Sequence, residues 1–167
     1  IKKRTVGVGV LSKEDAQSLG AVGPTLRASG VRSDARMLGY GPYKEMDFEP
    51  VVEEDGDCYA RGVVRVKEVL QALDLITRAL ERLPEGEIKV NFRGRLKGEV
   101  FKRMEQPRGE MLYYVRASRN KNLDRFRIRT PTFANIPPLL KMLPGCDLSD
   151  VPVITLSIDP CISCTER

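Results

Sequence analysis

Two cysteines, Cys161 and Cys164, lie near the end of the chain in the segment Asp-Pro-Cys-Ile-Ser-Cys. Thiolates at this spacing can bind one metal ion, and soft sulfur donors favour nickel, iron, copper or zinc over magnesium or calcium. A zinc site needs four ligands, but the chain has no histidine and its other cysteines, Cys58 and Cys146, are isolated. The pair therefore indicates half of a metal site, with a structural zinc half-site or a redox disulfide as the alternatives.

Two further segments carry side chains that could act beside a bound metal. Arg108 lies in a Gln-Pro-Arg-Gly-Glu segment, where proline and glycine are typical of a turn with a solvent-facing arginine. Pro131 and Thr132 are typical of a helix entry with Thr132 as its cap. In both segments the alternative is functional, because a fixed guanidinium or hydroxyl can donate hydrogen bonds to the ligands of a metal.

The overall composition excludes several classes of catalytic and metal site within the chain. The absence of histidine among the 167 residues excludes Ser-His-Asp triads and histidine-ligated metal sites within the chain. The length and the 41% of hydrophobic residues predict one globular domain. The net charge of +5 comes from basic residues interspersed with acidic ones, so we expect no nucleic-acid binding. No run of 18 apolar residues occurs, so we expect no membrane-spanning helix in the chain itself.

A long helix is the clearest element that the sequence predicts. Apolar residues recur at three- and four-residue steps between residues 60 and 83, so they share one helical face. They are Val66, Val69, Leu70, Leu73, Ile76, Leu80 and Leu83. We expect this face to be buried in the core, and Asp74 and Arg78 to pair on the solvent side.

A small sheet is predicted near the middle of the chain. Residues 112–116 and 125–129 are rich in aromatic and branched residues and flank a polar turn, which predicts two antiparallel strands. In the second strand Phe126 and Ile128 alternate with arginines, so we expect one buried face and one basic face.

Shorter elements are predicted towards both ends. Residues 5–10 alternate valine and glycine, which favours a short extended segment. Ser12 and Gly20 are typical of the two ends of a short helix. Residues 132–142 predict a helix that tolerates its two prolines near the start, and residues 151–158 are ambiguous between strand and helix, of which we favour the helix.

The Asp-Pro-Cys-x-x-Cys segment resembles the C-terminal motif of [NiFe] hydrogenase large subunits. The resemblance implies that Cys161 is a terminal nickel ligand and that Cys164 bridges nickel and iron in a NiFe(CN)2CO centre. Arg167 is similar to the residue at this position in energy-converting, membrane-bound hydrogenases. The family's second Cys-x-x-Cys pair, which supplies two more thiolates, does not occur in these 167 residues.

The Pro-Arg-Gly and Pro-Thr segments are also similar to segments of that family, and they occur in the same order along the chain. The resemblance implies that the guanidinium of Arg108 overhangs the two metals and donates to one cyanide. It implies that Pro131 and Thr132 surround the second cyanide, with the hydroxyl of Thr132 as donor.

The first half of the chain resembles the quinone-site large subunit of complex I, a relative that has lost the nickel ligands. The segments that carry this likeness are residues 4–10, 26–31, 56–61 and 83–90. We expect Cys58 to be a packed thiol in this part of the chain. We also expect buried ion pairs among four residues, namely Arg27, Asp34, Asp57 and Arg61.

Residues 1–167 are thus identified as the C-terminal portion of the large subunit of a complex-I-related, energy-converting [NiFe] hydrogenase. The expected fold is α+β and mainly helical, with a small antiparallel sheet. The expected partners are the remaining N-terminal part of the large subunit, an iron–sulfur small subunit, membrane subunits of a complex I-like assembly on the cytoplasmic side of the cell membrane, and ferredoxin. Two alternatives remain: a non-hydrogenase electron-transfer or scaffold subunit of a complex I-like ion pump, and a zinc-stapled interaction module.

Overall fold

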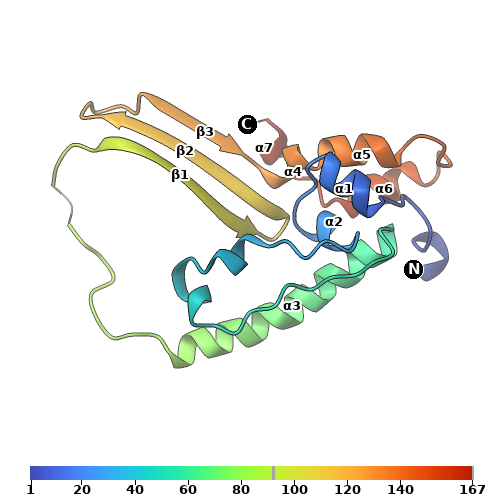
Figure 1. Cartoon of the computed structure of the whole chain (residues 1–167), viewed down its shortest axis with the longest axis horizontal. Helices are drawn as coiled ribbons and strands as arrows, with labels where there is room; N and C mark the ends of the chain where they lie inside the picture. Colours follow the sequence, from blue (N-terminus) through green and yellow to red (C-terminus); the bar gives the residue numbers. More distant parts are fainter. Residues whose placement is uncertain (92, 167) are drawn as a thin grey trace.

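The computed structural model describes residues 1–91 and 93–166, and Arg167 lies outside this part of the chain. Helices group around one end of the molecule and a sheet extends from them (Figure 1). The α-helices are α1 (Lys13–Ser18), α2 (Pro24–Arg27), α3 (Cys58–Glu81), α4 (Pro131–Ala134), α5 (Ile136–Met142), α6 (Val151–Ser157) and α7 (Ile162–Thr165). The 3-10 helices are η1 (Lys2–Arg4), η2 (Ala35–Leu38) and η3 (Gly41–Lys44), and the strands are β1 (Lys97–Gln106), β2 (Gly109–Ser118) and β3 (Arg125–Arg129).

The long helix predicted over residues 60–83 is confirmed as α3. It begins after Asp57, whose carboxylate accepts a hydrogen bond of 2.7 Å from the backbone N–H of Ala60. This N-cap satisfies one of the free amide donors of the first turn. The predicted pair of Asp74 and Arg78 also forms, one helical turn apart on an exposed side of α3.

The predicted burial of the apolar stripe on α3 is wrong. The seven predicted side chains, of which Leu83 lies just beyond the end of α3, are between 56% and 71% exposed in the described chain. The residues of α3 that are buried lie on another face, which includes Val64 and Leu75. Periodicity identifies the residues that share a face, but it does not say whether this chain covers that face.

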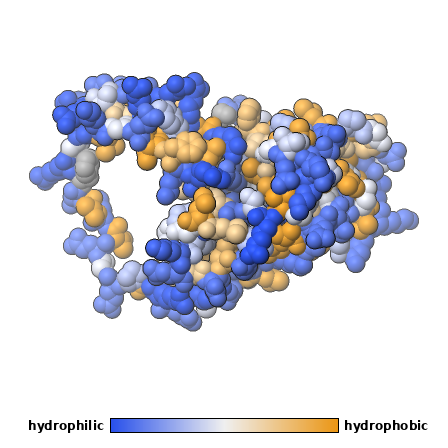
Figure 2. All heavy atoms as spheres, viewed as in Figure 1, coloured by the Kyte–Doolittle hydropathy of each residue, from blue (hydrophilic) through white to orange (hydrophobic). Residues whose placement is uncertain are grey.

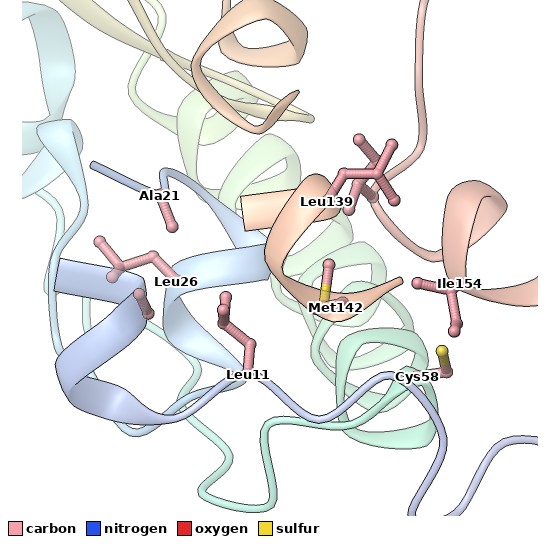
Figure 3. Packing of buried hydrophobic residues seen from close by; sticks show 9 residues of the cluster. Leu11, Ala21, Leu26, Cys58, Leu139, Met142 and Ile154 are labelled. Carbon is pink, nitrogen blue, oxygen red and sulfur yellow. The ribbon is translucent and has the colours of Figure 1, made fainter. Parts of the chain in front are cut away.

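The main core lies where the helices at the two ends of the chain meet (Figure 3). Leu11 packs there with Leu26 of α2, Met142 of α5 and Ile154 of α6. Cys58 at the start of α3 belongs to the same cluster, which confirms that it is a packed thiol. The core therefore joins the N-terminal segment to the region just before α7.

The sheet is antiparallel with the strand order β1-β2-β3. β2 and β3 confirm the two predicted strands, whereas β1 was not predicted. β1 and β2 form a hairpin in which Gln106 pairs with Gly109, so Arg108 sits in the turn. The expected buried face of β3 is wrong for Phe126, which is 49% exposed, while Ile128 is partly buried.

The short elements agree with the sequence except at two places. Residues 5–10 form turns and an irregular stretch rather than an extended segment, because Gly7 and Gly9 adopt positive φ angles of 71° and 59°. The helix predicted over 132–142 is broken at Asn135 into α4 and α5. The cap from Ser12 and the helical state of 151–158 are confirmed. In the described ranges, the helices are all too short or too polar to span a membrane.

Candidate metal centre

The two cysteines of the Cys-x-x-Cys motif lie on one helical turn. Cys161 is the N-cap residue of α7, and its carbonyl accepts hydrogen bonds from the N–H groups of Cys164 (3.0 Å) and Thr165 (3.2 Å). Residues three apart on a helix face the same side, so both thiols are presented together. Both residues are partly exposed, so both sulfurs remain accessible to a ligand.

The hydrogen bonds of the turn shift the pKa values of the two thiols in opposite directions. The Ser163 hydroxyl lies 3.2 Å from the Sγ atom of Cys161. A hydrogen bond from Ser163, and next one from the Cys164 thiol, lower the pKa of Cys161 to about 7. The hydrogen bond to Cys161 and the partial burial of the group raise the pKa of Cys164. The turn therefore favours the thiolate form of Cys161 over that of Cys164.

Two buried threonines of the α4 segment hold this turn in place. Thr132 accepts a hydrogen bond of 3.2 Å from the backbone N–H of Cys161, and Thr130 donates one to the backbone carbonyl of Cys164. Both threonines are 1% exposed. The alternative in which Thr132 is only a helix cap is wrong, because Thr130 is the N-cap of α4. Pro131 fills the N1 position between them, so α4 begins directly beneath the cysteines.

Arg108 reaches the segment that precedes the cysteines. Its Nε group donates to the backbone carbonyl of Asp159 at 2.9 Å, and lies 3.2 Å from the Oδ2 atom of the same residue. The positive charge is a minor cause of the lowered pKa of Cys161, and it opposes the rise in the pKa of Cys164. The description of Arg108 as a turn residue that only faces water is therefore wrong, and the structure brings it beside the cysteine pair.

The hairpin turn that carries Arg108 is pressed against the loop before α2. A Cβ atom added to Gly23 would lie 2.5 Å from the carbonyl oxygen of Arg108 and 2.7 Å from the backbone nitrogen of Gly109. Asn135, which is fully buried, fixes the same loop by accepting from the N–H of Val22 (3.0 Å) and donating to its carbonyl (3.2 Å). Sequence reasoning did not identify Gly23 or Asn135, because the contacts join segments about a hundred residues apart.

A cluster of buried ion pairs holds the end of β1, next to the hairpin turn that carries Arg108. The guanidinium of Arg27, which is 1% exposed, contacts Glu105 at 2.8 Å, Glu68 at 2.8 Å and Asp34 at 3.1 Å. Burial raises the pKa of Glu105, and the nearby charge of Arg27 opposes this rise. Arg27 and Asp34, two of the four residues expected in buried ion pairs, do form one. Since Glu105 lies three residues before Arg108, the cluster ties that end of β1 to α3.

The expectation that Asp57 and Arg61 also take part in buried ion pairs is wrong for the described residues. The carboxylate of Asp57 instead caps α3 and accepts from the N–H of Gly7 at 2.7 Å. Arg61 donates to the carbonyls of Gly56 and Gly9, each at 2.8 Å, and its Nη2 atom lies 3.2 Å from the Sγ atom of Cys58. The Asp57 carboxylate is used for capping, so the buried guanidinium of Arg61 is satisfied by backbone oxygens and by the Ser157 hydroxyl, to which its Nε group donates at 2.9 Å.

Among the described residues, the best candidates for metal ligands are the two thiols at the start of α7 and within it. Within residues 1–91 and 93–166, no group of three or more His, Cys, Asp and Glu side chains is placed to hold a metal ion. Cys58 is in the core, and Cys146 packs against the same core cluster, so the structure does not bring either of them to the motif. The arrangement offers two soft donors, an adjacent cation and a buried hydroxyl.

The comparisons with known proteins cover the whole chain. It matches the family described as the respiratory-chain NADH dehydrogenase 49 kDa subunit over residues 1–96 and 92–167. It is 40% identical to the carbon monoxide-induced hydrogenase of Rhodospirillum rubrum, a match that covers 100% of this chain and 47% of that protein. It is also 40% identical to the membrane-bound hydrogenase subunit alpha of Pyrococcus furiosus, covering 100% of this chain and 43% of that protein.

A relative with a different name is nearly as similar. The chain is 34% identical to an NADH-quinone oxidoreductase subunit of Clostridium beijerinckii, and this match covers 98% of the chain and 45% of that protein. The chain therefore spans somewhat less than half the length of these relatives.

Proposed function

Because this chain belongs to the family of the respiratory-chain NADH dehydrogenase 49 kDa subunit, we propose that it forms part of the catalytic large subunit of a [NiFe] hydrogenase within that family. The reaction is the reversible reduction of protons to dihydrogen. It is coupled to ferredoxin-type electron transfer and to ion translocation by a membrane complex.

The main support comes from the turn that presents Cys161 and Cys164 beside Arg108 and Thr132. Four side chains from three separate segments meet there, although 56 positions of sequence separate the first from the last. Their types are those that the resemblance assigns to a nickel–iron site. The two hydrogenases among the relatives add to this support, since each matches the entire chain.

The residues present fit one half of such a centre. Two adjacent thiols, one with a pKa of about 7, can both be deprotonated when a cation binds. The other two thiolates would come from the part of the large subunit that this chain does not contain. When bound, the NiFe(CN)2CO centre supplies the redox chemistry that interconverts protons and dihydrogen.

The chain's own residues would orient ligands and hold a proton. Cys161 would bind nickel and hold a proton on its Sγ atom, while Cys164 would bridge the two metals. Arg108 would supply a permanent positive charge whose direction is set by its bond to Asp159. Thr132 accepts the N–H of Cys161, so the proton of its own hydroxyl is left to donate to a ligand on iron.

The proposed assembly contains several further subunits. An iron–sulfur small subunit would bring electrons from a ferredoxin-like donor. The complex would include membrane subunits, and this chain would be a peripheral part of it on the cytoplasmic side of the cell membrane.

One observation favours a second candidate. The likeness to the NADH-quinone oxidoreductase relative is almost as extensive as the likeness to the hydrogenases. A non-hydrogenase electron-transfer or scaffold subunit of a complex I-like ion pump would also fit a chain that offers only two metal ligands.

Metal analysis of the intact complex tests both candidates. The hydrogenase predicts nickel and iron in stoichiometric amounts, and it predicts that Cys161→Ser or Cys164→Ser removes the nickel, because a hydroxyl is a harder and less acidic donor than a thiol. The scaffold subunit predicts a complex without nickel whose electron transfer is unchanged in both variants. Zinc bound at α7 instead of nickel would favour the third alternative, an interaction domain whose structure is stabilised by zinc.

A further inference from the structure

The positive charge of the chain is concentrated at one end of the sheet. Residues 93–103 and 116–127, which include most of β1 and β3 and the turn between β2 and β3, contain ten basic and two acidic side chains, a net charge of +8. The whole chain has a net charge of +5, so its other residues have a net charge of −3. This end of the sheet extends away from the helices (Figure 1), and Figure 2 shows mainly hydrophilic residues over it.

The strand register places several of these basic side chains on one face of the sheet. Arg116 of β2 lies directly opposite Glu99 of β1 on one side and Arg125 of β3 on the other. Residues opposite each other in antiparallel strands point to the same face, as do residues two apart along a strand. We call this face the basic surface, and its basic residues are Lys97, Arg103, Arg116, Arg125, Arg127 and Arg129.

Most of the basic surface has no compensating charge. Glu110 forms ion pairs with Arg103 and, at 2.8 Å, with Arg129. In residues 1–91 and 93–166, no carboxylate forms an ion pair with the four others, which are all exposed: Lys97, Arg116, Arg125 and Arg127. Like charges directly opposite each other destabilise a sheet, and Arg116 faces Arg125 in this way. A bound anion would remove this repulsion.

Exposed apolar side chains lie among these charges. Phe101 is 60% exposed and lies on the basic surface in the same cross-strand row as Arg127. Leu123, in the turn between β2 and β3, is 47% exposed. The guanidinium of Arg125 lies 5.9 Å from the centre of the Tyr114 ring. Basic residues interspersed with exposed apolar ones are typical of a surface that lies on a membrane, because phosphates bind the cations and the headgroup region accepts the apolar side chains.

We propose that the basic surface binds the anionic phospholipid headgroups of a membrane. The proposal rests on the proposed function, in which the chain is a peripheral part of a membrane complex. Five of the six basic residues are arginines, whose planar donors match the oxygens of a phosphate. Because the charges are spread over three strands and do not surround one pocket, they fit a surface with many phosphates better than one small anion.

The position of the basic surface is compatible with the candidate metal centre. The unpaired charges lie towards the end of the hairpin where Lys97 pairs with Ser118, whereas Arg108 lies in the turn at the opposite end. Contact with lipid would therefore leave Arg108 and the cysteines accessible to other subunits.

Sedimentation with lipid vesicles tests this surface without reference to activity. The full 167-residue chain is mixed at physiological salt with vesicles of phosphatidylcholine and phosphatidylglycerol, or with vesicles of phosphatidylcholine alone. We expect binding that requires the anionic phosphatidylglycerol and that weakens as salt is added, because salt screens exposed charges. Binding through the exposed apolar stripe on α3 would not need the anionic lipid, so the vesicles of phosphatidylcholine alone measure it.

Arg125→Glu/Arg127→Glu is the sharpest variant, because it should weaken lipid binding without destabilising the sheet. Each basic residue near an anionic membrane contributes about fivefold to the affinity, so reversing two charges should weaken binding by about a hundredfold. An acidic side chain at position 125 would face Arg116 and replace a repulsion with an attraction, so the variant should melt at the same or a higher temperature.

The matched control is Lys3→Glu/Lys13→Glu. It changes the net charge by the same amount at two exposed lysines that lie in η1 and α1, outside the sheet. We expect this control to bind the anionic vesicles like the wild-type chain.

Four results would overturn the proposal. The first is equal binding to both kinds of vesicle, and the second is binding to the anionic vesicles that the arginine variant leaves unchanged or that the control weakens equally. The third is tighter binding to a single-stranded DNA oligonucleotide, which would indicate a nucleic-acid surface. The fourth is tighter binding to polyglutamate, which would indicate an acidic protein partner. Nickel content does not enter these readouts, so failure here is distinct from failure of the hydrogenase assignment.

Discussion

Gly23→Ala should disable the proposed hydrogen chemistry although Gly23 touches neither cysteine. A Cβ atom at this position would lie 2.5 Å from the carbonyl oxygen of Arg108, whereas ordinary contact begins at 3.4 Å. The obstructing atoms are backbone, so the hairpin turn must move away by about 1 Å. A displacement of this size at a reacting centre can cost about a hundredfold in turnover, and we expect a loss of that order.

The control is Gly20→Ala. Gly20 also has a positive φ, 68° against 65° for Gly23, but a Cβ atom there meets nothing within 4 Å. Both variants place a Cβ atom on a residue with positive φ, but Gly23 also has a ψ of −145°, so its variant carries the larger backbone penalty in addition to displacing the turn. The assay is hydrogen evolution by the assembled complex with a reduced artificial donor, normalised to nickel measured on the same sample. Equal activity per nickel in the two variants would refute the role assigned to the turn.

Three further outcomes are expected. Arg108→Lys keeps the charge but loses the planar set of donors, so a complex fully loaded with nickel should turn over about a hundredfold more slowly; near-normal turnover would return Arg108 to a turn residue without function. In the free chain, alkylation of Cys161 should rise with a midpoint near its lowered pKa of about 7, whereas Cys164, whose pKa is raised, should react only at higher pH; matching profiles by peptide mass spectrometry would contradict this. Cys58→Ala and Cys146→Ala should retain nickel and lose only about 1 kcal/mol of unfolding free energy, and nickel loss from a stably folded variant would add a ligand to the site.

Local signals in the sequence were sufficient wherever a few neighbouring residues decide the structure. Ser12 was expected to cap the helix that it precedes, and this cap forms. Asp57, which was expected in an ion pair, caps α3 instead. The strand β1 was not predicted, because Lys97–Gln106 carries charges on both faces and has little strand propensity of its own. It forms through pairing with β2 along its whole length, which is a tertiary effect.

The sequence predicted the residues of the candidate site, but it did not predict most of the residues that hold them in place. The motif types identified Cys161, Cys164, Arg108 and Thr132, and the structure brings these four together. Thr130, Gly23 and Asn135 were missed, although they hold the same region in place. Of these, only Thr130 had a local signal, since threonine directly before proline is typical of an N-cap followed by an N1 residue.

The two largest disagreements between sequence and structure have a common physical cause. The stripe on α3 and Phe126 on β3 are apolar, periodic and exposed, while the thiol pair on α7 has two donors where a metal centre needs more. Each feature consists of residue types that are normally buried or metal-bound, but the described chain supplies only some of the neighbours that would bury or complete it. A hydrophobic face and a thiolate pair can both be completed by one additional polypeptide, and the relatives are long enough to contain it.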